Sequence, residues 1–176
     1  MTEGLRFGAW FDGHAAKEAI RDRLRPSERV GQLAGVVIAA IVAVYFTVLY
    51  TSSSGFFTSK FTAADAVLFF GIAFLGVIPG LVRGIIGRKN ATRPLDVILS
   101  ISMLVAAAWF LSSFPFDFSH LADALPSSLQ FLISWISDGF AKALMVIAII
   151  ASIFMIAYTT LLYLAVRRKL TGSAKG

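Results

Sequence analysis

The chain has 176 residues, of which 57% are hydrophobic and only 15% charged, and its formal net charge is +6. A soluble domain carries about 25% charged residues, so the composition excludes an ordinary soluble protein. The sequence contains no cysteine, which excludes disulfides, thiolate metal sites, iron–sulfur clusters and cysteine nucleophiles within it.

The low charge comes from four long apolar blocks, which are residues 30–50, 66–87, 95–116 and 141–166. Each block is long enough to cross a bilayer, which takes roughly 20 helical residues. We therefore predict an all-α integral membrane protein whose residues 30–170 form a bundle of four transmembrane helices. Residues 1–29 are then a cytoplasmic amphipathic segment, and residues 171–176 are a cytoplasmic tail.

The segment 1–29 has the pattern of a helix that lies on a membrane surface. After Asp12, the apolar residues Ala16, Ile20 and Leu24 recur at intervals of four, and charged residues fall on the opposite face. We expect a short surface helix on the cytoplasmic side, and a partly ordered tail is the alternative. No cleavable signal peptide is expected, because the first apolar run is too long and no small-residue cleavage site follows it.

The basic residues alternate between the connecting segments. They gather before the first block, between the second and third blocks and after the fourth, whereas the other two connections hold only Lys60 and Lys142. Lys and Arg near membrane helices are retained on the cytoplasmic side. The pattern predicts a multi-pass protein of a plasma or inner membrane with both termini in the cytoplasm. Since topology accounts for the charge, we expect no nucleic-acid partner.

Glycines mark one face of the second predicted helix. Gly76, Gly80 and Gly84 lie at every fourth position, and small residues at this spacing let another helix approach closely. Pro79 lacks a donor N–H and predicts a kink. Arg83 lies about one turn from the cytoplasmic end, within reach of the membrane surface by snorkelling. We interpret the stretch as a kinked helix-packing seam; the alternative is a functional hinge at Pro79 and Arg83 in a transport or gating site.

The first predicted helix carries a similar row of small residues. Gly31 and Gly35 are four residues apart, and Ala39 and Ala43 continue the row. Such rows favour close contact between membrane helices. The partners we expect are therefore membrane lipids and other transmembrane helices, either in a homo-oligomer or in a larger membrane complex.

Two acidic residues lie at predicted helix starts. Thr62 and Asp65 have the spacing of a capping box, so the second helix is expected to begin there. Asp96 falls in the first turn of the third helix, where the helix dipole favours an anion. Arg83, Arg88 or Arg93 could pair with Asp96. The alternatives are a functional carboxylate at Asp65 and a proton-relay acid at Asp96.

The connection between the third and fourth blocks is predicted to contain an amphipathic helix over about 127–137, lying in the outer membrane interface. The warrant is an apolar row opposite serines, formed by Leu125, Leu129, Leu132 and Ile136. The alternative is a helix that continues into the fourth span with a bend at Gly139. Phe114, Phe116 and Phe118 are expected to form an aromatic belt at the same interface.

Chemical motifs are missing from the predicted spans, whose centres hold no ionisable group. We expect no catalytic residues, no cofactor site and no metal site. His120 with Asp117 and Asp123 could form a weak outer metal site, although an exposed loop histidine explains it as well. The leading hypothesis is a non-catalytic structural or accessory membrane subunit. The alternatives are a homo-oligomeric channel or small transporter, and a lipid-interacting interfacial protein.

Overall fold

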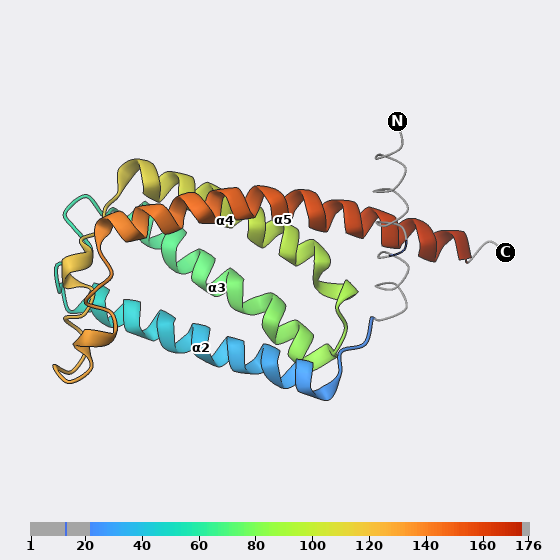
Figure 1. The fold of residues 1–176 in the computed structure, drawn as a ribbon, viewed down its shortest axis with the longest axis horizontal. Coiled ribbons are helices and arrows are strands. Elements are labelled where there is room, and N and C mark those ends of the chain that lie inside the picture. The colour runs from blue at the N-terminus through green and yellow to red at the C-terminus, as the bar shows by residue number, and fades with distance from the viewer. Residues whose placement is uncertain (1–12, 14–21, 174–176) are drawn as a thin grey trace.

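The computed structural model describes Gly13 and residues 22–173, and over these residues it is all-helical with two isolated β-bridges (Figure 1). Its four long helices are α2 (Pro26–Thr51), α3 (Ala63–Ile86), α4 (Arg93–Ser113) and α5 (Asp138–Ser173). Each is long and apolar enough to cross a membrane, so the predicted four-span, all-α architecture is confirmed. The surface helix predicted after Asp12 falls outside the described residues.

Helix α3 begins where the capping box predicts. The Thr62 backbone N–H donates to the Asp65 carboxylate at 2.7 Å, and the Asp65 N–H donates to the Thr62 hydroxyl at 3.3 Å. The other Asp65 oxygen accepts from the Trp109 indole of α4 at 2.6 Å. Asp65 is therefore buried with its oxygens occupied, and its interpretation as a cap is confirmed. The helix ends at Gly87, whose φ of 70° suits a residue without a Cβ.

The helices pack in chain order and leave the bundle open on one side. Packing is most extensive between α4 and α5 and between α2 and α3, and α3 also contacts α4. Over the described residues α2 and α5 make no extensive contact, and Figure 1 shows them on opposite sides of the molecule. A bundle that closes on itself needs a fourth extensive helix–helix contact, and the described residues of α2 and α5 do not make one.

The two ends of the bundle differ in chemistry. The end that holds residues 52–62 and 114–137, which we call the aromatic end, contains the buried core. That core consists of Leu49, Phe56, Ala106, Phe110, Phe116 and Leu121. Phe56 and Phe116 retain only 1% and 4% of their exposure, with ring centroids 5.6 Å apart. The expected aromatic belt is therefore wrong for Phe116, which packs inside the protein rather than against lipid headgroups.

The opposite end, which holds residues 22–29 and 87–93, is rich in arginine, and we call it the basic end. Here the segment before α2 pairs with the connection between α3 and α4 in a short antiparallel bridge between Arg23 and Arg88. Helix α5 passes this end in Figure 1. Its 36 residues span about 54 Å at 1.5 Å per residue, compared with a hydrocarbon core of about 30 Å.

The predicted amphipathic helix over 127–137 is wrong. This segment consists of successive turns and one three-residue 3-10 helix, Gln130–Leu132, and α5 begins only at Asp138. The alternative of one helix running on into the fourth span is therefore wrong too. The cause is local: so short a helix seldom offsets its nucleation cost, and serines favour turns. The Gln130 side-chain amide also donates a hydrogen bond to the Leu125 carbonyl at 3.3 Å.

Candidate functional site

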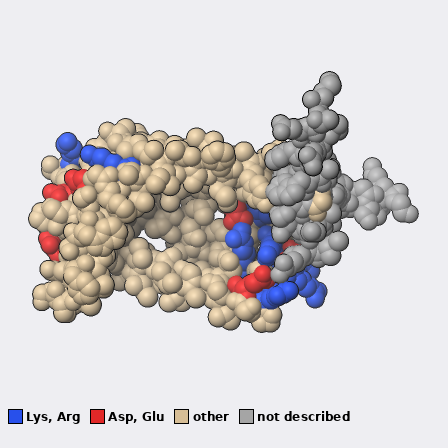
Figure 2. All heavy atoms as spheres, viewed as in Figure 1, with Lys and Arg blue, Asp and Glu red and all other residues tan. Residues whose placement is uncertain are grey.

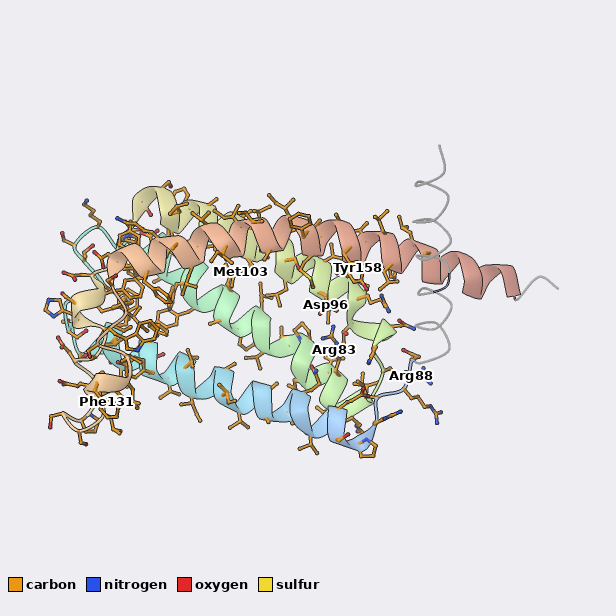
Figure 3. All side chains as sticks on the ribbon, in the orientation of Figure 1. Arg83, Arg88, Asp96, Met103, Phe131 and Tyr158 are labelled. Carbon is orange, nitrogen blue, oxygen red and sulfur yellow. The ribbon has the colours of Figure 1, made fainter. Side chains whose placement is uncertain are left out.

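Because α2 and α5 make no extensive contact, an apolar cleft of about 640 Å³ lies in the middle of the bundle. All four helices contribute to its walls. Figure 2 shows the hollow in the face between α2 and α5, with charged side chains gathered toward the basic end. Met103 of α4 is among the lining residues and points into the space between the helices in Figure 3. The cleft is as large as many small-molecule sites, which range over ~300–1,000 Å³.

Alanine explains why the cleft is open. Alanines line it from every helix, namely Ala39 and Ala43 of α2, Ala73 of α3, Ala106 and Ala107 of α4, and Ala141 and Ala148 of α5. Protein interiors normally pack to a density of about 0.74 and leave few voids larger than a water molecule. Small side chains facing one another across this space cannot reach that density, so they leave the cleft open.

Two glycines of the α3 row, Gly80 and Gly84, face the first helix. A Cβ built on Gly84 would lie 2.5 Å from Cδ2 of Leu33, and one on Gly80 would lie 3.0 Å from Cγ2 of Val36. These two glycines therefore allow α2 and α3 to approach within one chain. Gly76 has more room, because its nearest such neighbour is Leu99 at 4.0 Å.

The glycines of α2 are placed differently. A Cβ on Gly31 or Gly35 would meet no described atom within 4 Å. Both residues border a second cavity of about 290 Å³, which also reaches Ala39 of the apolar cleft. The row of small residues on α2 therefore lines open space, and Gly76 and Gly80 of the α3 row line the same cavity.

An ion pair lies at the inner wall of this second cavity, which we call the polar cavity. Arg83 of α3 pairs with Asp96 of α4, and its Nε donates to the Thr92 hydroxyl at 2.7 Å. The side chains of Arg83 and Asp96 are 25% and 20% exposed, and Figure 3 shows them pointing toward each other. The pairing of Asp96 with one of three arginines is confirmed for Arg83. The Arg83 guanidinium therefore ends in contacts with two side chains of the protein, Thr92 and Asp96.

Pro79 and Gln32 also line the polar cavity. Pro79 lies inside α3 and is buried, one turn before Arg83. The sequence analysis did not identify Gln32. It is the only side-chain amide in the first predicted span, and a single polar residue in an apolar span could have marked it as a candidate. The candidate hinge residues Pro79 and Arg83 therefore share a cavity wall with one amide and one carboxylate.

The outer His120 lies in a local pair. Its Nδ1 is 2.8 Å from Asp123 Oδ2, and this hydrogen bond raises the pKa of His120. The Asp117 carboxylate accepts instead from the Ser119 backbone at 3.0 Å, and Ser119 holds the pKa of Asp117 below its ordinary value. Within residues 22–173 no three His, Cys, Asp or Glu side chains are grouped so that they could hold a metal ion.

The four apolar helices define the class of this chain, which is a multi-pass membrane protein with four spans. Comparison goes no further, since no protein-family model, no curated protein and no solved structure matches it.

Proposed function

We propose that this protein is a non-catalytic accessory subunit that packs against a transmembrane helix of another polypeptide. The observation that carries the proposal is the open apolar cleft between α2 and α5. A membrane helix of the partner supplies the missing contact, because alanine walls allow a helix backbone to come close. The basic end faces the cytoplasm in this proposal, since Lys and Arg are retained there.

Three features favour a helix as the occupant. The cleft is lined by apolar side chains, so it offers no polar group to orient a polar ligand. Its small residues come from helices on both sides, which suits a rod inserted between them. The uncovered row of Gly31 and Gly35 on α2 extends the same wall toward the basic end. An occupant of helical length therefore finds small residues along more than the apolar cleft alone.

Filling the cleft tests the proposal. Ala43→Leu on α2 and Ala148→Leu on α5 place bulk in the cleft, whereas Ala40→Leu adds the same atoms to an exposed position of α2. The full chain is expressed in its own membrane, extracted in mild detergent and sized on a native gel, with the polypeptides identified by mass spectrometry. We expect the parent and Ala40→Leu to migrate with a second membrane polypeptide, and both cleft variants to release it.

Cross-linking adds a positional readout, because the chain has no cysteine of its own. A photo-crosslinker on Ala43→Cys is expected to label the polypeptide that co-migrates, and the same reagent on Ala40→Cys is not. Cleft variants that retain the partner would overturn the proposal. An assembly of this chain alone would replace it with a homo-oligomer, and a cleft that cross-links only to lipid would assign an acyl chain as the occupant.

A second candidate function rests on the ion pair. A charge pair beside a polar cavity is a feature of transport pathways, since ionisable groups within a membrane are costly. In this alternative Arg83 and Asp96 belong to the site of a small transporter or channel, with Pro79 as its hinge. Purified protein in liposomes would then support ion flux that Arg83→Gln abolishes. Flux at the level of empty liposomes would remove this candidate.

A further inference from the structure

Two arginines face each other across the short bridge at the basic end. The Leu24 N–H donates to the Gly87 carbonyl at 2.8 Å, and the Lys89 N–H donates to the Asp22 carbonyl at 2.9 Å. These bonds flank Arg23 and Arg88, which form the non-hydrogen-bonded pair between them. Side chains of such a pair project from the same face of the two segments, with Cβ atoms roughly 4.5–5.5 Å apart.

Among the described residues, no acidic side chain neutralises the two guanidinium groups. Arg23 and Arg88 are exposed, and no side chain within the described ranges forms an ion pair or hydrogen bond with either. Like charges placed directly opposite each other destabilise an antiparallel pair. Two other basic residues of this end differ, because Arg83 pairs with Asp96 and Lys89 lies 3.9 Å from Glu28.

The backbone holds the two arginines in place despite their repulsion. Arg29 Nε donates to the Gly84 carbonyl at 2.9 Å, and its Nη2 donates to the Ile85 carbonyl at 2.6 Å, which ties α2 to the last turn of α3. The Asn90 N–H donates to the Asp22 carboxylate at 2.9 Å. The pair is therefore preorganised, so an anion that binds it does not have to order the backbone first.

The position of the bridge along α3 indicates which kind of anion the two arginines would meet. Arg88 lies two residues after Ile86, the last residue of α3, and Ile85 and Ile86 are 63% and 55% exposed on the apolar surface of that helix. The bridge therefore lies where a span leaves the hydrocarbon, at the level of lipid headgroups. Arginine binds phosphate oxygens with a planar fork of donors.

We propose that Arg23 and Arg88 together bind the phosphate of an anionic phospholipid in the leaflet at the basic end. The lipid relieves the repulsion between the two side chains and clamps the segment before α2 to the connection before α4. This site is separate from the apolar cleft, so it stands whether or not a partner helix occupies that cleft.

Lipid titration of the purified full-length protein in mild detergent tests the site. Phosphatidylglycerol is the anionic probe and phosphatidylcholine the zwitterionic one, with bound lipid counted by native mass spectrometry and thermal stability measured in parallel. We expect the parent to prefer phosphatidylglycerol. Arg23→Gln and Arg88→Gln should each weaken that binding about tenfold, because each removes charge-assisted hydrogen bonds to the phosphate. The matched control is Lys60→Gln, an exposed cation at the aromatic end, which should leave the preference intact.

A second pair of variants guards against misfolding. Arg23→Lys and Arg88→Lys keep the charge but lose the planar fork, so both should fold and show intermediate binding. The proposal fails if the glutamine variants keep the parent's lipid preference, or if Lys60→Gln weakens binding equally. Inorganic phosphate added without lipid separates the two sources of the anion. If it stabilises the protein as much as phosphatidylglycerol does, the site takes free phosphate, and the lipid assignment is overturned.

Discussion

Removing one member of the Arg83–Asp96 pair should destabilise the protein more than removing both. Asp96→Asn leaves the Arg83 guanidinium largely buried between α3 and α4 without its counter-charge. Breaking a buried pair in this way costs about 3–5 kcal/mol. These side chains keep 25% and 20% of their exposure, so we expect about 2–3 kcal/mol of the free energy of unfolding to be lost.

The double variant Arg83→Gln/Asp96→Asn distinguishes two causes of destabilisation, namely a buried charge left without its partner and the loss of the contact itself. Glutamine and asparagine can still hydrogen-bond, and no charge is left buried, so the double variant should recover at least half of the lost stability. The assay is equilibrium unfolding in mixed micelles with increasing SDS, followed by circular dichroism.

The matched control for the ion pair is Glu28→Gln. Its partner Lys89 is 3.9 Å away, and both side chains are about one-third exposed. Such a surface pair contributes about 0–1 kcal/mol. The glutamine also keeps an oxygen that can accept from the Arg25 N–H. The reasoning is refuted if Asp96→Asn costs no more than Glu28→Gln, or if the double variant is as unstable as Asp96→Asn alone.

Three further predictions concern the glycine packing, the orientation in the membrane and the outer histidine. Gly84→Ala should lower the free energy of unfolding by about 1–3 kcal/mol, because the added methyl group overpacks the contact with α2. Gly35→Ala places its methyl group in open space, so it should be neutral or stabilising by up to about 1 kcal/mol. Unfolding in SDS compares the two variants. A cysteine at Asn90 should react with an impermeant maleimide only from the cytoplasmic side, and labelling from outside would reverse the proposed orientation. The His120–Asp123 bond raises the pKa of His120 above 6.5. Its stabilisation is therefore full below pH 6.5 and disappears as pH rises through the higher folded value, so Asp123→Asn should destabilise at pH 5.5 more than at pH 8.5.

Much of the fold could be predicted because insertion into a membrane leaves strong signals in sequence. The spans follow from apolar length, and the capping box at Thr62 and Asp65 locates the start of α3 within one turn. The Arg83–Asp96 contact was one of three pairings that spacing allowed. Only packing could choose among them, because Arg88 and Arg93 both lie nearer to Asp96 in the chain than Arg83 does.

The cleft could not be predicted, for a physical reason. In a soluble helix the buried face is apolar and the exposed face polar, so periodicity reveals the core. In a membrane both the lipid and the protein interior are apolar. The sequence of a row such as Ala39 and Ala43 therefore does not show whether that face of the helix contacts lipid or another helix. The helix predicted over residues 127–137 was wrong for a different reason. Its apolar spacing fits a helix, but spacing alone does not show that serines and the Gln130 amide will satisfy the backbone through turns.

Packing in chain order also bears on how the protein is made. Ribosomes deliver the spans one at a time, and here α3 meets α2, α4 meets α3 and α5 meets α4 as each emerges. Each of α3, α4 and α5 therefore finds a packing neighbour already in the bilayer when it is inserted, without waiting for a later segment to close a ring. Folds dominated by such local contacts form quickly. The flank of α2 that faces the cleft packs extensively against neither α4 nor α5, so in the proposed assembly a second polypeptide can join it before or after translation ends.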